Sequence, residues 1–192
     1  MHDLAAGVAS FQRDVFPSKA ELFARLATRH RPETLFIGCS DARVIPELVT
    51  NSEPGELFVI RTAGNLVPAY PDTDGVTASI EYAVAVLGVS RIVVCGHSGC
   101  GAMTALAEGR ELSGTPMLAE WLRHAGYAAS GVSVAKLVRA NVLAQLANLA
   151  GHPSVARAVE AGDLTVEGWV FDIGTGAITV LDGSDTGSVP TI

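Results

Sequence analysis

Apolar residues along this chain gather into short unbroken runs, and these runs predict strands. A strand that is covered on both faces of a sheet shows no alternation of apolar and polar positions. Leu35-Phe36-Ile37 is one such run and Ile92-Val93-Val94 is another. We predict strands at 34–38, 57–61, 91–95 and 166–173, and a short strand at 177–181 after a Gly174-Thr175-Gly176 turn. The last two strands are expected to form an antiparallel hairpin.

Segments with apolar residues at helical spacing separate most of these strands. Residues 4–29 are predicted as a helix that breaks near Pro17, and further helices are predicted at 75–87, 100–107, 116–125, 133–149 and 154–161. Strands that alternate with helices imply right-handed crossovers and a mostly parallel sheet. We therefore predict an α/β fold with a mostly parallel central sheet, helices on both faces, and a C-terminal antiparallel edge strand.

The composition fits one globular domain. The chain has 192 residues, of which 48% are hydrophobic and 17% charged, which is enough to build a full core. Because there is no internal repeat or low-complexity linker, we predict a single domain over 1–192, with a helical N-terminal arm at 1–30 and a loose tail at 183–192. The net charge of −7 argues against a nucleic-acid partner, since no basic stripe is available to replace phosphate counterions.

The sequence also predicts where the protein acts. No apolar stretch approaches the ~20 residues needed to span a bilayer, and the start Met1-His2-Asp3-Leu4 lacks the pattern of a signal peptide. Three cysteines are an odd number and do not suggest a disulfide framework, whereas thiols in a reducing cytosol stay free to bind metal. We expect a cytoplasmic protein without a membrane partner, in which Cys95 is a buried, inert thiol.

Metal-ligating residues follow two of the predicted strands. Cys39 begins the block Cys39-Ser40-Asp41-Ala42-Arg43, and His97-Ser98-Gly99-Cys100 follows a second strand. Ligands collect at the carboxyl ends of parallel strands, so both blocks should lie at one edge of the sheet. Two thiolates and one imidazole make a three-ligand zinc site with a position for water, which is the arrangement of a catalytic zinc. The alternative for the second block is a glycine-rich turn with a chance histidine and a buried cysteine.

Asp41 and Arg43 stand two residues apart, so in an extended segment they lie on the same side. One interpretation is a surface ion pair that contributes ~0–1 kcal/mol. The other is that Arg43 holds Asp41 ionised beside the metal, where the carboxylate accepts the proton of a zinc-bound hydroxide and aims its lone pair at an electrophile. Zinc with two thiolates and a neutral imidazole has no net charge, so its water should be harder to deprotonate than one on three histidines. We therefore expect activity to rise with pH.

The pattern Cys39-x-Asp41-x-Arg43 with His97-x-x-Cys100 resembles that of the β-class carbonic anhydrases, and the similarity extends through most of residues 8–182. Further similar segments are Pro54-Gly55-Glu56-Leu57-Phe58-Val59-Ile60-Arg61, Ala63-Gly64-Asn65-Leu66-Val67, Ser79-Ile80-Glu81-Tyr82-Ala83-Val84 and Gly168-Trp169-Val170-Phe171-Asp172. The resemblance implies a zinc lyase that reversibly hydrates carbon dioxide to bicarbonate and a proton, with one Zn²⁺ per subunit on Cys39, His97 and Cys100. It also implies a homodimer, or a multiple of dimers, whose N-terminal helices embrace a partner subunit.

The resemblance extends to the substrate pocket. Phe58, Ala63 and Tyr82 match positions that wall it, with plain core packing as the alternative for each. An apolar wall suits carbon dioxide, which carries no charge. We expect the amide of Gly101, at a predicted helix start, to hold the oxygen that becomes bicarbonate. His30 stands where family members often have glutamine, and we predict that it contributes to substrate binding; the alternative is a surface histidine.

One branch of the family binds bicarbonate at a non-catalytic site that uses a Trp, an Arg and a Tyr. The matching positions here hold Phe36, Arg61 and Phe171. We therefore predict no such inhibitory site, and water rather than Asp41 at the fourth zinc position. Two other functions stay open: the same site could hydrolyse another small linear electrophile, such as carbon disulfide or carbonyl sulfide, or the zinc could stabilise a non-enzymatic binding domain in which protein closes the fourth position.

Overall fold

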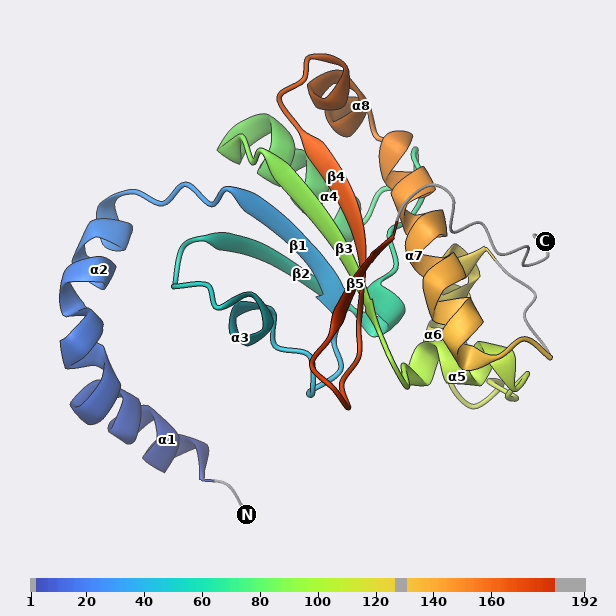
Figure 1. Cartoon of the computed structure of the whole chain (residues 1–192), viewed down its shortest axis with the longest axis horizontal. Helices are drawn as coiled ribbons and strands as arrows, with labels where there is room; N and C mark the ends of the chain where they lie inside the picture. Colours follow the sequence, from blue (N-terminus) through green and yellow to red (C-terminus); the bar gives the residue numbers. More distant parts are fainter. Residues whose placement is uncertain (1–2, 127–130, 182–192) are drawn as a thin grey trace. The chain divides into compact units, whose positions relative to one another are not determined.

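The structure is a computed structural model that describes residues 3–126 and 131–181 (Figure 1). The chain divides into two compact units, Met1–Arg31 and Pro32–Ile192. The tail predicted at 183–192 lies outside the described residues. Within the described part, no helix has both the length and the apolar character that crossing a membrane requires.

Helices make up the N-terminal unit. They are α1 (Leu4–Ser10), the π-helical turn η1 (Phe11–Val15) and α2 (Phe16–Thr28). The predicted break near Pro17 is instead this widened turn: a proline in the first turn of α2 has no N–H to donate, and its ring clashes with the carbonyl four residues earlier in a regular helix. Phe11, Phe16 and Phe23 form a ring cluster with centroids 5.5 to 6.3 Å apart. No described residue from 3 to 31 is buried.

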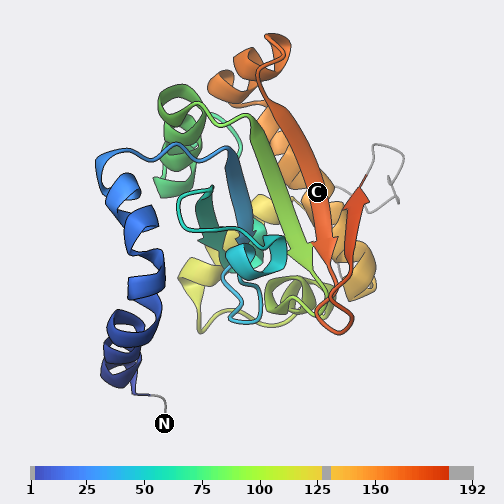
Figure 2. The ribbon, with the colours of Figure 1, turned by 60° about the vertical axis from the view of Figure 1, so that its left-hand side comes forward.

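Five strands form the sheet of the second unit, in the order β2-β1-β3-β4-β5. Their bounds are Thr34–Cys39 (β1), Leu57–Thr62 (β2), Arg91–His97 (β3), Thr165–Phe171 (β4) and Ile178–Leu181 (β5). The first four are parallel, and β5 runs antiparallel to β4 (Figure 2). The predicted α/β fold is therefore confirmed. β3 is two residues longer than predicted, because Gly96 and His97 continue to pair with β4 after the apolar run has ended.

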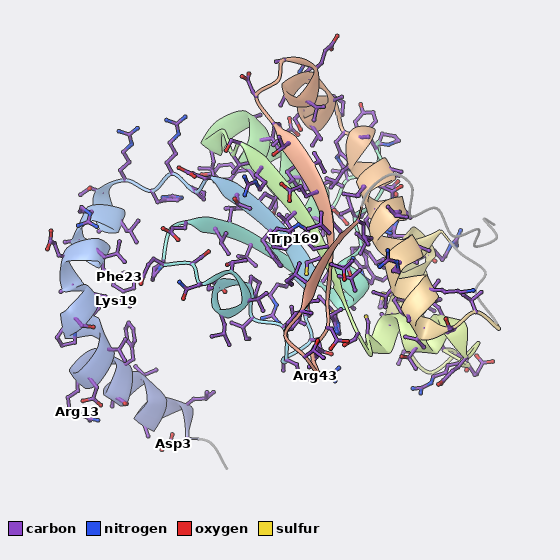
Figure 3. All side chains as sticks on the ribbon, viewed as in Figure 1. Asp3, Arg13, Lys19, Phe23, Arg43 and Trp169 are labelled. Atoms are coloured by element: carbon purple, nitrogen blue, oxygen red, sulfur yellow. The ribbon has the colours of Figure 1, made fainter. Side chains whose placement is uncertain are left out.

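Helices cover the two faces of the sheet unequally. One face carries α4 (Gly75–Glu81) with its π-helical continuation η3 (Tyr82–Leu87), α7 (Val134–Ala150) and α8 (Pro153–Glu160). The other face carries Phe36, Val93 and Cys95, which pack against Trp169. Trp169 is labelled in Figure 3. The short helix α3 (Pro46–Thr50) borders that face. The sequence does not predict α3, because five residues are too few to show a helical period.

Two glycines let α7 approach the sheet closely near its carboxyl edge. A Cβ atom on Gly96 would lie 2.8 Å from Val142 Cγ2, and one on Gly168 would lie 2.9 Å from Val142 Cγ1. The remaining helical segments are the 3-10 turn η2 (Ala63–Asn65), α5 (Gly101–Ala107), α6 (Pro116–Leu122) and the 3-10 turn η4 (Arg123–Ala125). Side chains of α5, α6 and α7 join Cys39 and Cys100 in a second apolar cluster. The edge of the sheet that carries the cysteines is therefore packed and enclosed.

Candidate active site

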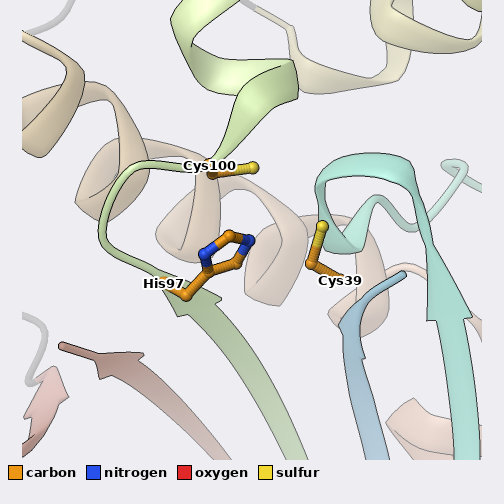
Figure 4. A group of neighbouring side chains, drawn as sticks. All are labelled: Cys39, His97 and Cys100. Carbon is orange, nitrogen blue, oxygen red and sulfur yellow. The ribbon is translucent and has the colours of Figure 1, made fainter. Parts of the chain in front are cut away.

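The structure brings together the three residues predicted as metal ligands. Cys39 ends β1, His97 ends β3, and Cys100 immediately precedes α5. Their side chains converge on one point (Figure 4), and one ligand atom from each lies within 4.8 Å of the other two. All three residues are buried: His97 is 0% exposed, Cys100 1% and Cys39 6%. The parallel register of β1 and β3 produces this meeting, as expected for the carboxyl ends of adjacent strands.

The turn between the strand and the helix fixes the orientation of His97. Ser98 anchors this turn to the end of β4, because its N–H donates to Phe171 O at 2.9 Å and its Oγ accepts from Ile173 N at 2.9 Å. The Ser98 carbonyl lies 3.0 Å from Nδ1 of His97. A carbonyl only accepts, so Nδ1 carries the proton and Nε2 carries the lone pair. Nε2 is buried and has no hydrogen-bond partner among the described residues, which suits a metal ligand.

In the metal-free protein, Cys39 is the cysteine that is arranged to hold a negative charge. The neighbouring Cys100 thiol lowers the pKa of Cys39 despite burial, and the nearby His97 ring and the Gly64 amide lower it more. The pKa of Cys100 is raised by the neighbouring Cys39 and by burial. For His97, burial lowers the pKa, but the neighbouring Cys39 thiolate outweighs burial and the net shift is upward. Cys95 is different: it is buried in the core, as the sequence predicts, and burial raises its pKa to about 12.

Asp41 and Arg43 form a two-pronged ion pair at the edge of the cluster. Nε of Arg43 donates to Oδ1 of Asp41 at 2.9 Å, and Nη2 donates to Oδ2 at 2.7 Å. Nη2 also reaches the carbonyl of Gly99 at 3.3 Å, which ties the pair to the turn between His97 and Cys100. These bonds hold the pKa of the Asp41 carboxyl well below its ordinary value. The Asp41 side chain is 19% exposed and the Arg43 side chain is 54% exposed, and the catalytic role of the pair stays a prediction.

Arg61 supports the same loop from β2, a contact that the sequence analysis does not foresee. Its Nε donates to the carbonyl of Cys39 at 3.0 Å, and its Nη2 donates to the carbonyl of Asp41 at 2.7 Å. The only sequence signal is an arginine near the end of an apolar strand. Arg61 fixes the backbone that carries a ligand and the carboxylate together.

The residues predicted to bind substrate are not all near this cluster. Phe58 and Tyr82 contact each other, with ring centroids 6.0 Å apart. Phe58 pairs with Leu35, four residues before Cys39, and so lies about 13 Å from it along the strands. Gly101 is the first residue of α5, directly after Cys100. His30 follows α2 in the N-terminal unit, and its role stays a prediction.

Comparison with known proteins identifies the family. Residues 34–178 match the family model described as carbonic anhydrase. A carbonic anhydrase from Pseudomonas aeruginosa is 55% identical over 195 residues, covering 96% of this chain and 89% of the relative. The structure of the β-carbonic anhydrase CcaA has a TM-score of 0.87 at 38% identity and covers 94% of each chain. A chain from the crystal structures of two tetrameric β-carbonic anhydrases of the ascomycete Sordaria macrospora has a TM-score of 0.82 at 30% identity, covering 93% of this chain and 94% of that chain. The chain therefore belongs to the β-carbonic anhydrase family.

Proposed function

We propose that this chain reversibly hydrates carbon dioxide to bicarbonate and a proton, with one Zn²⁺ per subunit held by Cys39, His97 and Cys100. Membership of the family indicates the reaction. The observation that supports the metal is the buried cluster of two sulfurs and one imidazole, in which Nε2 of His97 has no partner among the described residues. Two thiolates and an imidazole suit zinc, and three protein ligands are the number that a catalytic zinc site uses.

When bound, zinc would supply a Lewis acid that turns water into a nucleophile near neutral pH. The chain's own residues would orient that nucleophile. Because Arg43 keeps Asp41 ionised and holds both of its oxygens, the carboxylate only accepts hydrogen bonds. Asp41 would accept a hydrogen bond from the attacking oxygen, and this bond would turn a lone pair of that oxygen toward the carbon of carbon dioxide. Arg43 and Arg61 keep the carboxylate in that position.

We also propose that the active enzyme is a homodimer or a multiple of dimers. The N-terminal arm exposes large apolar side chains, namely Leu4, Val8, Phe11, Val15 and Phe16, and such a surface is typical of an interface. Phe58 and Tyr82 lie far from the cluster of their own chain, so as walls of a substrate pocket they would serve the site of a partner subunit. The predicted contact of His30 with substrate depends on the same assembly. We place the enzyme in the cytoplasm, because three free cysteines fit a reducing compartment.

Stopped-flow measurement of carbon dioxide hydration by the purified protein tests the function. We expect activity that a zinc chelator abolishes and added zinc restores. Cys100→Ser should lose zinc and activity, whereas the matched variant Cys95→Ser should keep both. Activity that survives complete removal of metal would overturn the proposal. Carbon disulfide and carbonyl sulfide should be assayed in parallel, because turnover of either one without carbon dioxide hydration would replace the assigned substrate.

A further inference from the structure

The segment 63–68 lies beside the proposed metal centre and has little regular structure. It begins with the short turn η2 and contains two residues with left-handed backbone, Gly64 at φ 80° and Asn65 at φ 50°. The amide N–H of Gly64 donates to Sγ of Cys39 at 3.4 Å. This short segment therefore supplies a hydrogen bond to one of the proposed ligand atoms. Something outside the segment must hold it in place.

Three amide side chains on α7, which we call the amide ladder, bind this segment: Asn141, Gln145 and Asn148. Asn141 Nδ2 donates to Gly64 O at 2.9 Å. Gln145 Oε1 accepts from Val67 N at 2.8 Å, and Asn148 Nδ2 donates to Val67 O at 2.8 Å. The ladder thus hydrogen-bonds to the backbone of Gly64 and Val67 from a helix almost 80 residues away in sequence.

The ladder is also bonded to itself, which fixes the direction of each amide. Gln145 Nε2 donates to Asn141 Oδ1 at 3.0 Å and to His124 O at 3.3 Å. Asn141 and Gln145 are both 0% exposed. Buried amides destabilise a core unless they are hydrogen-bonded, and a helix face that only packs would be better served by apolar side chains. The buried amides therefore do more than pack: they hold the backbone of residues 64–67 through hydrogen bonds.

We propose that Asn141, whose side chain Gln145 holds in place, positions the proposed zinc site. By holding the Gly64 carbonyl, Asn141 keeps the N–H of the same residue on Cys39 Sγ. That bond directs the sulfur and limits how much electron density it donates, which is how outer hydrogen bonds tune a metal ligand. Trp121 supports the neighbouring residue from the other side, since its Nε1 donates to Ala63 O at 2.9 Å. The inference rests on the proposed function, because it assumes that Cys39 binds zinc.

Asn141→Leu tests this role, and Asn148→Leu is the matched control. Both variants place the same side chain on the same helix and remove one hydrogen bond each, but Asn148 binds Val67, three residues beyond Gly64. We expect Asn141→Leu to accelerate zinc loss to a chelator about 10–100-fold and Asn148→Leu to change it little. In the cobalt-substituted protein, Asn141→Leu should move the thiolate-to-metal charge-transfer band to lower energy, because the sulfur loses its N–H bond. The control should leave the band in place.

Thermal unfolding of the metal-free proteins separates positioning from stability. If Asn141→Leu does not fold, Asn141→Asp keeps the size of the side chain and removes the donor to Gly64. The inference would be overturned if Asn141→Leu and Asn148→Leu lost the same stability while Asn141→Leu released zinc at the wild-type rate and left the cobalt band in place. The proposed function would then remain intact. A wild-type protein that takes up no zinc would overturn both. Zinc uptake without carbon dioxide hydration would overturn the function alone.

Discussion

Oδ2 of Asp41 lies 3.9 Å from Nε2 of His97. The two side chains come from different strands, since Asp41 follows β1 and His97 ends β3. The distance is too long for a hydrogen bond. Because Nδ1 of His97 faces Ser98 O, the ring nitrogen nearest the carboxylate is the one with the free lone pair. The proposed ligand atom Nε2 of His97 and the hydrogen-bond acceptor Oδ2 of Asp41 therefore lie side by side. Orienting a metal-bound nucleophile requires an acceptor at such a position.

Asp41→Ala should lower the turnover of carbon dioxide hydration by about 100-fold, because the nucleophile loses the acceptor that orients it. Zinc should stay bound, because none of the three proposed ligands changes. The measurement is stopped-flow kinetics together with metal analysis of the same preparation. Asp163→Ala, at an exposed turn, is the control and should behave as wild type. Full activity in Asp41→Ala would remove the role assigned to this carboxylate.

The affinity for zinc should rise with pH. In the metal-free protein the pKa values of Cys100 and His97 are raised, the first by the neighbouring Cys39 and by burial, and the second by the Cys39 thiolate against the opposing effect of burial. Zinc binds thiolates and neutral imidazole, so protons must leave as zinc enters. Each proton released makes the apparent affinity rise about tenfold per pH unit. Competition with a chelator of known affinity at pH 6, 7 and 8 measures the slope, and a flat profile would contradict the prediction.

The sequence predicts the strands and the grouping of Cys39, His97 and Cys100 well, for a physical reason. Unbroken apolar runs such as Leu35-Phe36-Ile37 specify strands covered on both faces, and alternation with helices makes the strands parallel. Parallel strands share one carboxyl edge, and because β1 and β3 are also neighbours in the sheet, Cys39 and His97 meet there. The boundary of β3 is harder to predict, because Gly96 and His97 pair with β4 without being apolar.

The supporting contacts are not predictable from local pattern. The apolar spacing of residues 133–149 predicts an amphipathic helix, and Asn141 and Gln145 fall among its apolar positions, but this spacing does not say what two amides there would bind. In the structure both are fully buried, because their partners come from a segment almost 80 residues earlier. Arg61 is a similar case, since its two carbonyl partners lie on another strand and the loop that follows it. Hydrogen bonds between distant segments leave no period in the sequence.

Gly96→Ala should destabilise the protein by about 1–3 kcal/mol, the usual range for an overpacked core. The new methyl would lie 2.8 Å from Val142 Cγ2 and 3.1 Å from Val138 Cγ1. Because residue 96 precedes His97, zinc affinity should fall as well. Urea unfolding of the metal-free protein measures the loss, and adding Val142→Ala should recover part of it. Gly75→Ala, which meets nothing within 4 Å, is the control. Wild-type stability in Gly96→Ala would show that α7 can move away.

Charges on the apolar surface of the arm should dissociate the assembly. Val8 and Val15 are 57% and 42% exposed, and an interface that buries them cannot accept two carboxylates without a large cost of desolvation. We expect Val8→Glu with Val15→Glu to shift the protein toward monomers in sedimentation velocity. Arg13→Ala, also on the arm and exposed, should assemble as wild type. Unchanged assembly of the double variant would mean that the arm does not hold the subunits together.

Arg61 also bears on regulation by bicarbonate. Two of its guanidinium nitrogens already donate to the carbonyls of Cys39 and Asp41. Phe36 is fully buried and packs edge-on against Trp169, with ring centroids 6.4 Å apart. Phe36 and Phe171 offer no polar group in their side chains where the regulated branch has a Trp and a Tyr. Of the three matching positions, Arg61 alone carries a positive charge. A bicarbonate ion there would have to compete with the carbonyls of Cys39 and Asp41 for the Arg61 guanidinium.

We therefore expect no cooperative inhibition by bicarbonate. The rate of carbon dioxide hydration at constant ionic strength should fall hyperbolically as bicarbonate rises, as simple product inhibition at one site requires. Sodium chloride at matched ionic strength is the control for general anion effects. A sigmoidal loss of activity would contradict the prediction, and so would bicarbonate bound beside Arg61 in soaked crystals with Asp41 on zinc. The reason is energetic: moving Asp41 onto the metal would break both of its bonds to Arg43, and bicarbonate has too few anchors here to compensate for them.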